Sequence, residues 1–243
     1  MKEDRNYDEM TVAEIVTQNI KTADIFKKNG IDFCCGGNVL VRDICEKKKV
    51  DYEQIKKDIL SLEAEPKQFD FDSWDLDFLA DYIINTHHKY VTEANDLVKM
   101  YSNKVAKVHG HHYTEVVEID RLFMDIAAEL DMHMQKEEAI LFPHIKRIAQ
   151  AKKAGERIDT PPFGTVQNPI NMMEAEHDEA GDIMKKIAEL SNNFTPPESA
   201  CNTFRALYAK LEEYQNDLFQ HIHLENNILF PKAIKMEGEV LNA

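Results

Sequence analysis

The sequence is poor in positive charge. It contains 29 lysine and arginine residues against 44 aspartate and glutamate residues, which gives a formal net charge of −15 at pH 7. Such a surface repels the phosphates of nucleic acids and of anionic membranes, and it leaves many carboxylates available for cations. The composition therefore argues against a nucleic-acid partner.

The chain also lacks a long apolar segment. No apolar run approaches the roughly 20 residues that a membrane-spanning helix needs. The first residues, MKEDRNYDEM, are charged and contain no apolar core, so they do not resemble a secretory signal. We expect a protein with no membrane partner that resides in the cytoplasm.

Cysteine is scarce, and its spacing is not that of a disulfide framework. The chain has four cysteines, of which Cys34 and Cys35 are adjacent while Cys45 and Cys201 are isolated. Small secreted domains use more regular cysteine patterns. A reducing compartment fits this usage, and we expect Cys45 and Cys201 to pack in the core.

Residues 1–66 are predicted to form a small helical domain that contains the paired cysteines. Thr11 and Glu14 form a capping-box pattern at the start of one helix. A second helix, KTADIFKKN, is expected to end at Gly30. Asn38 and Asp51 are expected to cap the helices in VLVRDICEKKK and YEQIKKDILSLE.

Residues 73–238 are predicted to form four long helices. From Ser73 onward, apolar residues recur at helical spacing, and KVHGHHY, AGERIDTPPFGTVQNP and NNFTPPES separate the helices. The fold class is therefore predicted to be all-α, with a four-helix bundle preceded by the small helical domain.

Two stretches of the chain are nearly the same. HMQKEEAILFPHI starts at His133 and HIHLENNILFPKA starts at His221, and each places a glutamate four residues after its first histidine. Such polar residues interrupt the apolar stripe of every long helix, where burial without a partner is costly. One histidine per helix recurs at intervals of 45, 44 and 44 residues, which indicates an internal duplication. The candidate metal ligands are His88, His133, Glu137, His177, His221 and Glu225.

These residue types in this pattern predict a metal centre. A histidine and a glutamate four residues apart lie on one face of a helix and can reach the same ion. Four imidazoles and two carboxylates exceed the ligands of a tetrahedral zinc site but suit two six-coordinate ions with bridging carboxylates. We expect two iron ions, with manganese second, and open positions for an oxo group, water or a diatomic molecule.

Several neighbouring residues leave alternatives open. His87 would replace His88 as the first ligand if the helix register shifted by one, although position 88 fits the intervals better. Glu129, one turn before His133, and Glu176, next to His177, are candidates for orienting an imidazole or relaying a proton. A solvated or capping role is the alternative for both glutamates.

Other histidines and two prolines are interpreted structurally. The histidines without the spacing of the six candidates are expected to face solvent or to lie in loops: His109, His111, His112, His144 and His223. Pro143 and Pro231 each remove one helical hydrogen bond, so we expect their helices to kink or end there, with the preceding Leu and Phe residues sealing the bundle.

The adjacent cysteines suggest chemistry at the sulfur atoms. Cys34 and Cys35 can bridge to each other only through a strained ring, so an exposed dithiol, a disulfide with a partner or a soft-metal contact suits them better. The start of the following helix favours the thiolate. Simple packing of two small residues is the alternative.

With DFCCGGN at 32–38 in front and the two repeated helices behind, the sequence resembles the Repair of Iron Centres family, which are hemerythrin-like di-iron proteins of bacteria. MEAEHDEAG and HIHLENN also match segments of that family, and the front domain resembles its small cysteine-bearing domain of the ScdA N-terminal type. The likeness covers about residues 11–235. It places the family's ligands on the same six residues and its two suspected carboxylates on Glu129 and Glu176.

The resemblance implies repair of iron–sulfur clusters damaged by nitric oxide or oxidants, with iron supplied from the di-iron centre and damaged iron–sulfur proteins as partners. Reduction of nitric oxide at the paired irons is an alternative, and enzyme activity stays open. An oxygen carrier or sensor is disfavoured, because a pure carrier would not need DFCCGGN. An exposed dithiol would make a homodimer through the front domain plausible.

Overall fold

The structure is a computed structural model that describes residues 7–63 and 69–241. In these two ranges the chain forms helices and connecting loops, and its only β-type pairing is an isolated antiparallel bridge between Thr11 and Leu40. The prediction of an all-α fold is confirmed. No helix in the described ranges is long and apolar enough to cross a bilayer.

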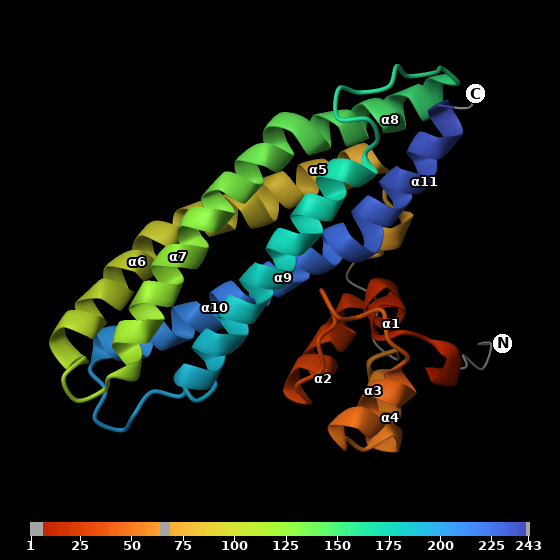
Figure 1. Cartoon of the computed structure of the whole chain (residues 1–243). Coiled ribbons are helices and arrows are strands. Elements are labelled where there is room, and N and C mark those ends of the chain that lie inside the picture. The colour runs from red at the N-terminus through yellow and green to blue at the C-terminus, as the bar shows by residue number, and fades with distance from the viewer. Residues whose placement is uncertain (1–6, 64–68, 242–243) are drawn as a thin grey trace.

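Four short helices form the front part of the molecule. They pack together on one side of the long helices, next to α9, α10 and α11 (Figure 1). Single 3₁₀ turns at Tyr7–Glu9 and Ile20–Thr22 accompany them. The four helices are α1 (Val12–Gln18), α2 (Ala23–Lys28), α3 (Val41–Lys48) and α4 (Tyr52–Glu63).

Three of the predicted helix ends in this part are confirmed. The Thr11 hydroxyl accepts a hydrogen bond from the Glu14 amide, and the Glu14 carboxylate accepts one from the Thr11 amide at 2.7 Å. Gly30, with φ of 64°, turns the chain after α2. The Asp51 carboxylate accepts hydrogen bonds from the first amides of α4.

The prediction that Asn38 caps the third helix is wrong. Helix α3 begins at Val41, and its N-cap residue, Leu40, makes no side-chain capping bond. Residues 37–41 instead pair with residues 10–13 through backbone hydrogen bonds, including Val12 N–H to Val39 O at 3.0 Å. This pairing takes up the backbone groups that a helix beginning at Asn38 would need.

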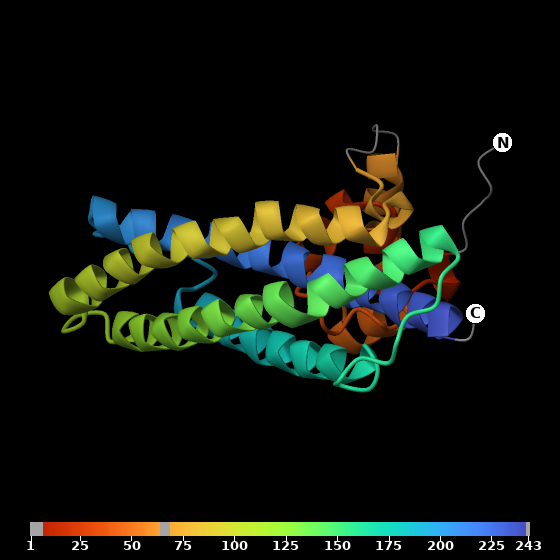
Figure 2. The same cartoon turned by 90° about the horizontal axis from the view of Figure 1, so that it is seen from above.

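The long helices form a four-rod bundle. Each rod runs alongside its neighbours through most of its length (Figures 1 and 2). The first rod is α5 (Leu76–Ile83) and α6 (Lys89–His109), and the second is α7 (Glu115–Lys136) and α8 (Phe142–Ala154). The third rod is α9 (Gln167–Leu190), and the fourth is α10 (Asn202–Leu224) and α11 (Phe230–Leu241).

The interrupted rods do not end at their interruptions. A π-helical turn joins the two halves of each, at Ile84–His88, Glu137–Leu141 and Glu225–Leu229. Two of these turns lie just before Pro143 and Pro231, where the wider turn accommodates a residue without an amide hydrogen. Of the two predicted alternatives, a kink or an end at the prolines, the end is wrong, because α8 and α11 continue for 13 and 12 residues.

The apolar core is divided in two. One cluster joins the front helices to α6, α7, α9 and α10, and the other joins α5, α8 and α11 to the start of α9. In the first three rods the change from one cluster to the other falls around a predicted ligand, and in the fourth it falls at His223, between His221 and Glu225. The flanking pairs are Ile83 and Val91, Met134 and Leu141, Met173 and Ala180, and Ile222 and Leu224.

The predicted domain boundaries at 66 and 73 stay predictions. Residue 66 lies outside the described residues, and the chain resumes just before a 3₁₀ turn at Phe71–Ser73. The last helix continues past the predicted end at 238 to Leu241. Front helices and bundle share one cluster of buried side chains, so the cysteine segment lies directly against the bundle.

Candidate metal centre

The structure brings all six predicted ligands together between the two apolar clusters. Each is at most 2% exposed. They form two groups whose donor atoms lie within 4.8 Å of one another, and both groups contain Glu137 and Glu225. His88 and His221 complete one group, and His133 and His177 complete the other.

The imidazoles face each other in pairs. The Nε2 atoms of His88 and His221 are 3.2 Å apart, and those of His133 and His177 are 3.0 Å apart. Two neutral imidazoles with both lone pairs at such a contact repel each other, so a proton or a metal ion must lie between them. The geometry of both pairs is that of nitrogen donors aimed at a common point.

The carboxylates lie between the pairs. Glu137 approaches the Nε2 atoms of His88 and His133 at 3.4 and 3.3 Å. Glu225 approaches those of His221 and His177 at 3.0 and 3.1 Å. Both oxygens of Glu137 and one of Glu225 are buried without a hydrogen bond, which is costly unless a cation binds them. Each carboxylate is therefore positioned to serve both groups.

The π-helical turns help to position these ligands. Glu137 and Glu225 are the first residues of their turns, and His88 is the last residue of its own. In the second and fourth rods, the carbonyls of Glu137 and Glu225 accept the amides of Phe142 and Phe230, five residues on. The additional residue per turn alters the direction of the side chains relative to a regular α-helix. Turns of this kind are frequent at functional sites.

Three of the four imidazoles have a partner on the side away from the centre. His88 Nδ1 lies 2.8 Å from Glu138, His133 Nδ1 lies 2.8 Å from Glu176, and His177 Nδ1 lies 2.8 Å from Asn226. Such partners hold an imidazole with its Nε2 directed at the metal. The Nδ1 atom of His221 is buried and has no hydrogen-bond partner.

Sequence reasoning found one of these three partners and missed two. Glu176 contacts His133, as expected for a residue that orients an imidazole. Glu138 and Asn226 were missed, although each directly follows a predicted carboxylate ligand in the repeated stretch. This shared position in the duplication was the available signal.

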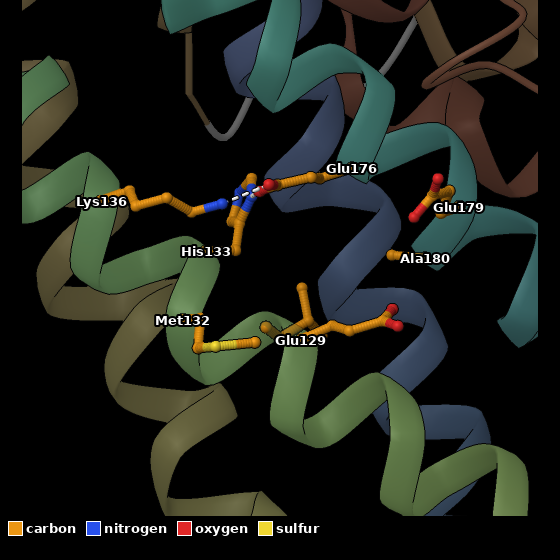
Figure 3. Close-up of a pocket in the computed structure, with 8 residues that line it drawn as sticks. Glu129, Met132, His133, Lys136, Glu176, Glu179 and Ala180 are labelled. Carbon is orange, nitrogen blue, oxygen red and sulfur yellow. Dashed lines mark hydrogen bonds and ion pairs between the residues drawn. The ribbon is translucent and has the colours of Figure 1, made fainter.

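Glu129 contacts no ligand directly but lines a cavity that leads to one (Figure 3). The cavity of about 130 Å³ lies between α7 and α9 and is also lined by His133, Lys136, Glu176 and Glu179. Lys136 makes an ion pair with Glu176 there. Partial burial, with the nearby Glu179 and Asp125 carboxylates, raises the pKa of Glu129.

The geometry favours position 88 over position 87 as the first candidate ligand. His88 belongs to a ligand group, whereas His87 does not. The ring of His87 instead stacks on that of His221, with centroids 5.6 Å apart and planes 5° apart, and its Nδ1 lies 3.0 Å from Asp217.

The cysteine pair lies beside the centre, but its expected exposure is wrong for Cys34. That residue is 2% exposed, while Cys35 is half-buried, and both thiols are free, with sulfurs 3.8 Å apart. Asp32 accepts hydrogen bonds from both cysteine amides. The hydrogen bond to Cys35, together with burial, raises the pKa of the Cys34 thiol well above its usual value.

Contacts with the bundle fix the cysteine segment. The Cys35 thiol donates to the backbone carbonyl of His177 at 3.6 Å, and the Asn227 amide donates to the Cys34 carbonyl at 3.0 Å. Lys185 of α9 pairs with Asp32 at 2.8 Å. The pair thus touches the backbone of a predicted ligand, although neither sulfur belongs to a ligand group.

Other predictions for histidine and cysteine had mixed outcomes. His144 and His223 are buried, not solvent-facing: His144 pairs with Glu237 at 2.9 Å, and His223 lies against the carbonyl of Phe33. Cys45 is buried as predicted, whereas Cys201 is exposed at the start of α10, so its assignment to the core is wrong. His111 and His112 are exposed as predicted.

The buried donor set is compatible with iron binding. It consists of imidazole nitrogens and carboxylate oxygens, which suit iron and manganese, and the ligand groups contain no sulfur donor.

The pKa of Glu137 shows how the histidines balance the charge of a buried carboxylate. Burial raises the pKa of Glu137, but the facing histidines outweigh burial and lower it to about 2.

Comparisons with known proteins agree with this arrangement. Residues 79–233 match the family described as "Hemerythrin HHE cation binding domain", and residues 8–63 match ScdA_N, described as "Domain of Unknown function (DUF542)". The "Iron-sulfur cluster repair protein YtfE" of Yersinia pseudotuberculosis serotype IB (strain PB1/+) is 36% identical over 214 residues, covering 88% of this chain and 91% of that protein. The protein of the same name from Yersinia pestis (strain Pestoides F) is 36% identical over 218 residues, covering 89% and 93%. With its cation-binding bundle and its front domain both matched, the chain belongs to the hemerythrin-like Repair of Iron Centres family.

Proposed function

We propose that the protein holds two iron ions between its four rods and supplies iron to repair iron–sulfur clusters damaged by nitric oxide or oxidants. The observation that carries this proposal is the sharing of Glu137 and Glu225 by two otherwise separate ligand groups. Each ion would take two imidazoles and the two bridging carboxylates. The printed name of the relatives, iron–sulfur cluster repair protein, agrees with this role.

The donor set favours an exchangeable centre. Four protein ligands per ion leave an iron ion, which prefers six, with positions for small ligands. The bound ions would supply electrons and open positions for ligands. The four imidazoles and the two carboxylates would hold the ions. Glu138, Glu176 and Asn226 would fix the orientation of three of these imidazoles.

A path for iron fits the cavity between α7 and α9. Glu129, Glu176 and Glu179 give its lining a negative potential, and His133 is also part of the lining (Figure 3). In this proposal Glu176 exchanges between the ion pair with Lys136 and a passing cation. Iron leaving by this route would reach damaged iron–sulfur proteins in the cytoplasm.

Reduction of nitric oxide is the second candidate. It is favoured by the closeness of the two ligand groups, because a ferrous pair held there would have open positions for two diatomic molecules and could supply two electrons. The proposed homodimer through the front domain loses part of its basis, since Cys34 is buried and its carbonyl accepts a hydrogen bond from Asn227 of the bundle.

Repair can be tested by mixing the anaerobic ferrous protein with a [4Fe–4S] hydratase inactivated by nitric oxide. We expect hydratase activity to return while iron leaves this protein. The zinc-loaded protein is the control, because it has the same fold but no iron to give. Equal recovery with the zinc-loaded protein would contradict iron supply, and consumption of free nitric oxide without recovery would favour the second candidate.

Substitution of both cysteines should separate iron binding from repair. Neither sulfur is in a ligand group, so Cys34→Ala with Cys35→Ala is expected to keep two irons per chain. Repair should slow severalfold, because we expect the thiols to take part in the transfer of iron. Cys45→Ala, which removes a buried thiol from the same part of the chain, is the matched control. Loss of iron from the double variant would show that the cysteines are required for metal loading.

Metal loading should release protons in a pH-dependent manner. Burial lowers the pKa of His88 and His133, but the Glu137 and Glu225 carboxylates outweigh burial and raise it to about 10 and about 9. Both imidazoles therefore carry protons near neutral pH, and these protons must leave when metal binds. We expect about two protons per chain at pH 7.5, measured by titration calorimetry in buffers of different ionisation enthalpy.

The sign of the accompanying stability change follows from the same values. Because the pKa values in the folded protein exceed the unfolded value of about 6.5, these pairs stabilise the metal-free protein fully below that pH. Their contribution is lost as the pH rises through 9 to 10. Metal binding should then tighten and release fewer protons, and uptake without proton release at pH 7.5 would contradict the assignment.

A further inference from the structure

His221 differs from the other three imidazoles of the centre. Its Nε2 atom faces the centre, 3.0 Å from Glu225 and 3.2 Å from His88. When Nε2 binds a metal, the ring proton must be on Nδ1, which is then a donor. That Nδ1 atom is buried and has no hydrogen-bond partner, whereas the other three imidazoles each have one.

An acceptor is available one helical turn away. Asp217 precedes His221 by four residues on α10, so both side chains lie on one face of the helix. One Asp217 oxygen lies 3.0 Å from His87 Nδ1, and the other, Oδ2, is buried without a partner. His221 Nδ1–H is therefore a buried donor without an acceptor, and Asp217 Oδ2, one turn earlier, is a buried acceptor without a donor.

His87 holds both residues in place. Its Nδ1–H donates to Asp217, and the face of its ring lies parallel to that of His221. The rings of Tyr82 and His87 pack in a T-shaped arrangement, with centroids 5.8 Å apart. His87 is 2% exposed and belongs to neither ligand group, so it is a buried neighbour of both Asp217 and His221.

We propose that Asp217 is a positioning residue that accepts the Nδ1–H of His221, directly or through one water, and that His87 fixes the Asp217 carboxylate for this task. This inference rests on the proposed metal centre and assigns its fourth imidazole a partner. It also explains why a second histidine adjoins His88. The His87–Asp217 pair would do for His221 what Glu138, Glu176 and Asn226 do for the other three.

The test compares Asp217→Asn and Asp217→Leu with wild-type protein loaded with zinc or ferrous iron. Release of each ion to a chelator is followed by stopped flow. Partners of this kind are worth about 10- to 100-fold in metal affinity, so Asp217→Leu should release one ion at least about tenfold faster, with a smaller effect for Asp217→Asn. Only one ion should be affected, because His221 belongs to one ligand group.

Two further variants separate positioning from packing. His87→Phe keeps a ring against His221 but loses the bond to Asp217, and it should still accelerate release. Glu213→Gln is the control. It removes a carboxylate one turn before Asp217 that pairs with Lys210, and it should not accelerate metal release. If packing alone mattered, His87→Phe and the isosteric Asp217→Asn would both behave as wild type.

A readout independent of release is the proton on His221 Nδ1, observed by nitrogen-15 NMR in the zinc-loaded protein. It should exchange with solvent faster in both Asp217 variants. The proposal would be overturned if both Asp217 variants released metal and exchanged the His221 Nδ1 proton at wild-type rates. It would also be overturned if the release of both ions were accelerated equally. If wild-type protein bound only one ion, the proposed function would fail, while the His221 proton would still report on Asp217.

Discussion

Replacing Glu225 with glutamine should remove iron from both halves of the centre, leaving well below two ions per chain. The carboxylate belongs to both ligand groups and contacts His221 and His177 at 3.0 and 3.1 Å. Glutamine keeps the shape but loses the charge that draws and bridges the cations. Substitution of a residue that only supports a ligand costs about 10- to 100-fold in metal affinity, so loss of a shared ligand should exceed that range.

The measurement is iron per chain after anaerobic loading and gel filtration, with Mössbauer spectroscopy to count coupled ions. His88→Ala offers a comparison, because His88 belongs to one group and its loss should weaken chiefly one ion. Asp178→Asn is the control, since Asp178 adjoins His177 in sequence but is exposed. If Glu225→Gln kept one ion tightly bound, the carboxylate would not be shared, and the two-ion arrangement would be wrong.

Removal of the metals should lower the melting temperature by about 15–30 °C. A ligand present at 1,000 times its dissociation constant stabilises the native state by about 4 kcal/mol per site. Two such sites give about 8 kcal/mol, and each kcal/mol shifts the melting temperature of a chain of this size by about 2–4 °C. The effect is large because the ligands come from all four rods, so bound ions hold every long helix to the others.

Scanning calorimetry of the zinc-loaded and metal-free proteins checks this expectation without oxidation of iron. The difference in melting temperature between the zinc-loaded and metal-free proteins should be smaller at acidic pH, because protons compete with metal for the imidazoles and carboxylates. A Glu137→Gln with Glu225→Gln variant should melt at one temperature with or without zinc. A large shift in that variant would mean that zinc stabilises the protein at another site.

The general arrangement of the bundle and its centre could be predicted from spacing alone. The helical period of the apolar residues identified the four rods, and the duplication gave the interval at which His88, His133, His177 and His221 recur. Thr11 and Glu14 could be predicted because a capping box is local and needs no knowledge of distant residues.

What failed depends on contacts between distant parts of the chain. Asn38 is a good capping residue, but the backbone around it pairs with residues 10–13. His144 is buried because Glu237, 93 residues later, supplies a partner, and Cys201 is exposed because α10 begins at the rim of the bundle. The π-helical turns share no sequence signal, because two of them precede a proline whereas the turn at Ile84–His88 does not.

The division of the core at the ligands has a mechanical consequence. Each rod packs in an apolar cluster on either side of the centre, while the stretch between the clusters places the imidazoles and carboxylates of the predicted ligands against one another. Without a cation, that stretch contains buried carboxylate oxygens of Glu137 and Glu225 that have no hydrogen-bond partner, which is unfavourable. We expect a bundle built in this way to stay assembled through its two apolar clusters when the centre is empty, so that metal could bind again without refolding of the chain.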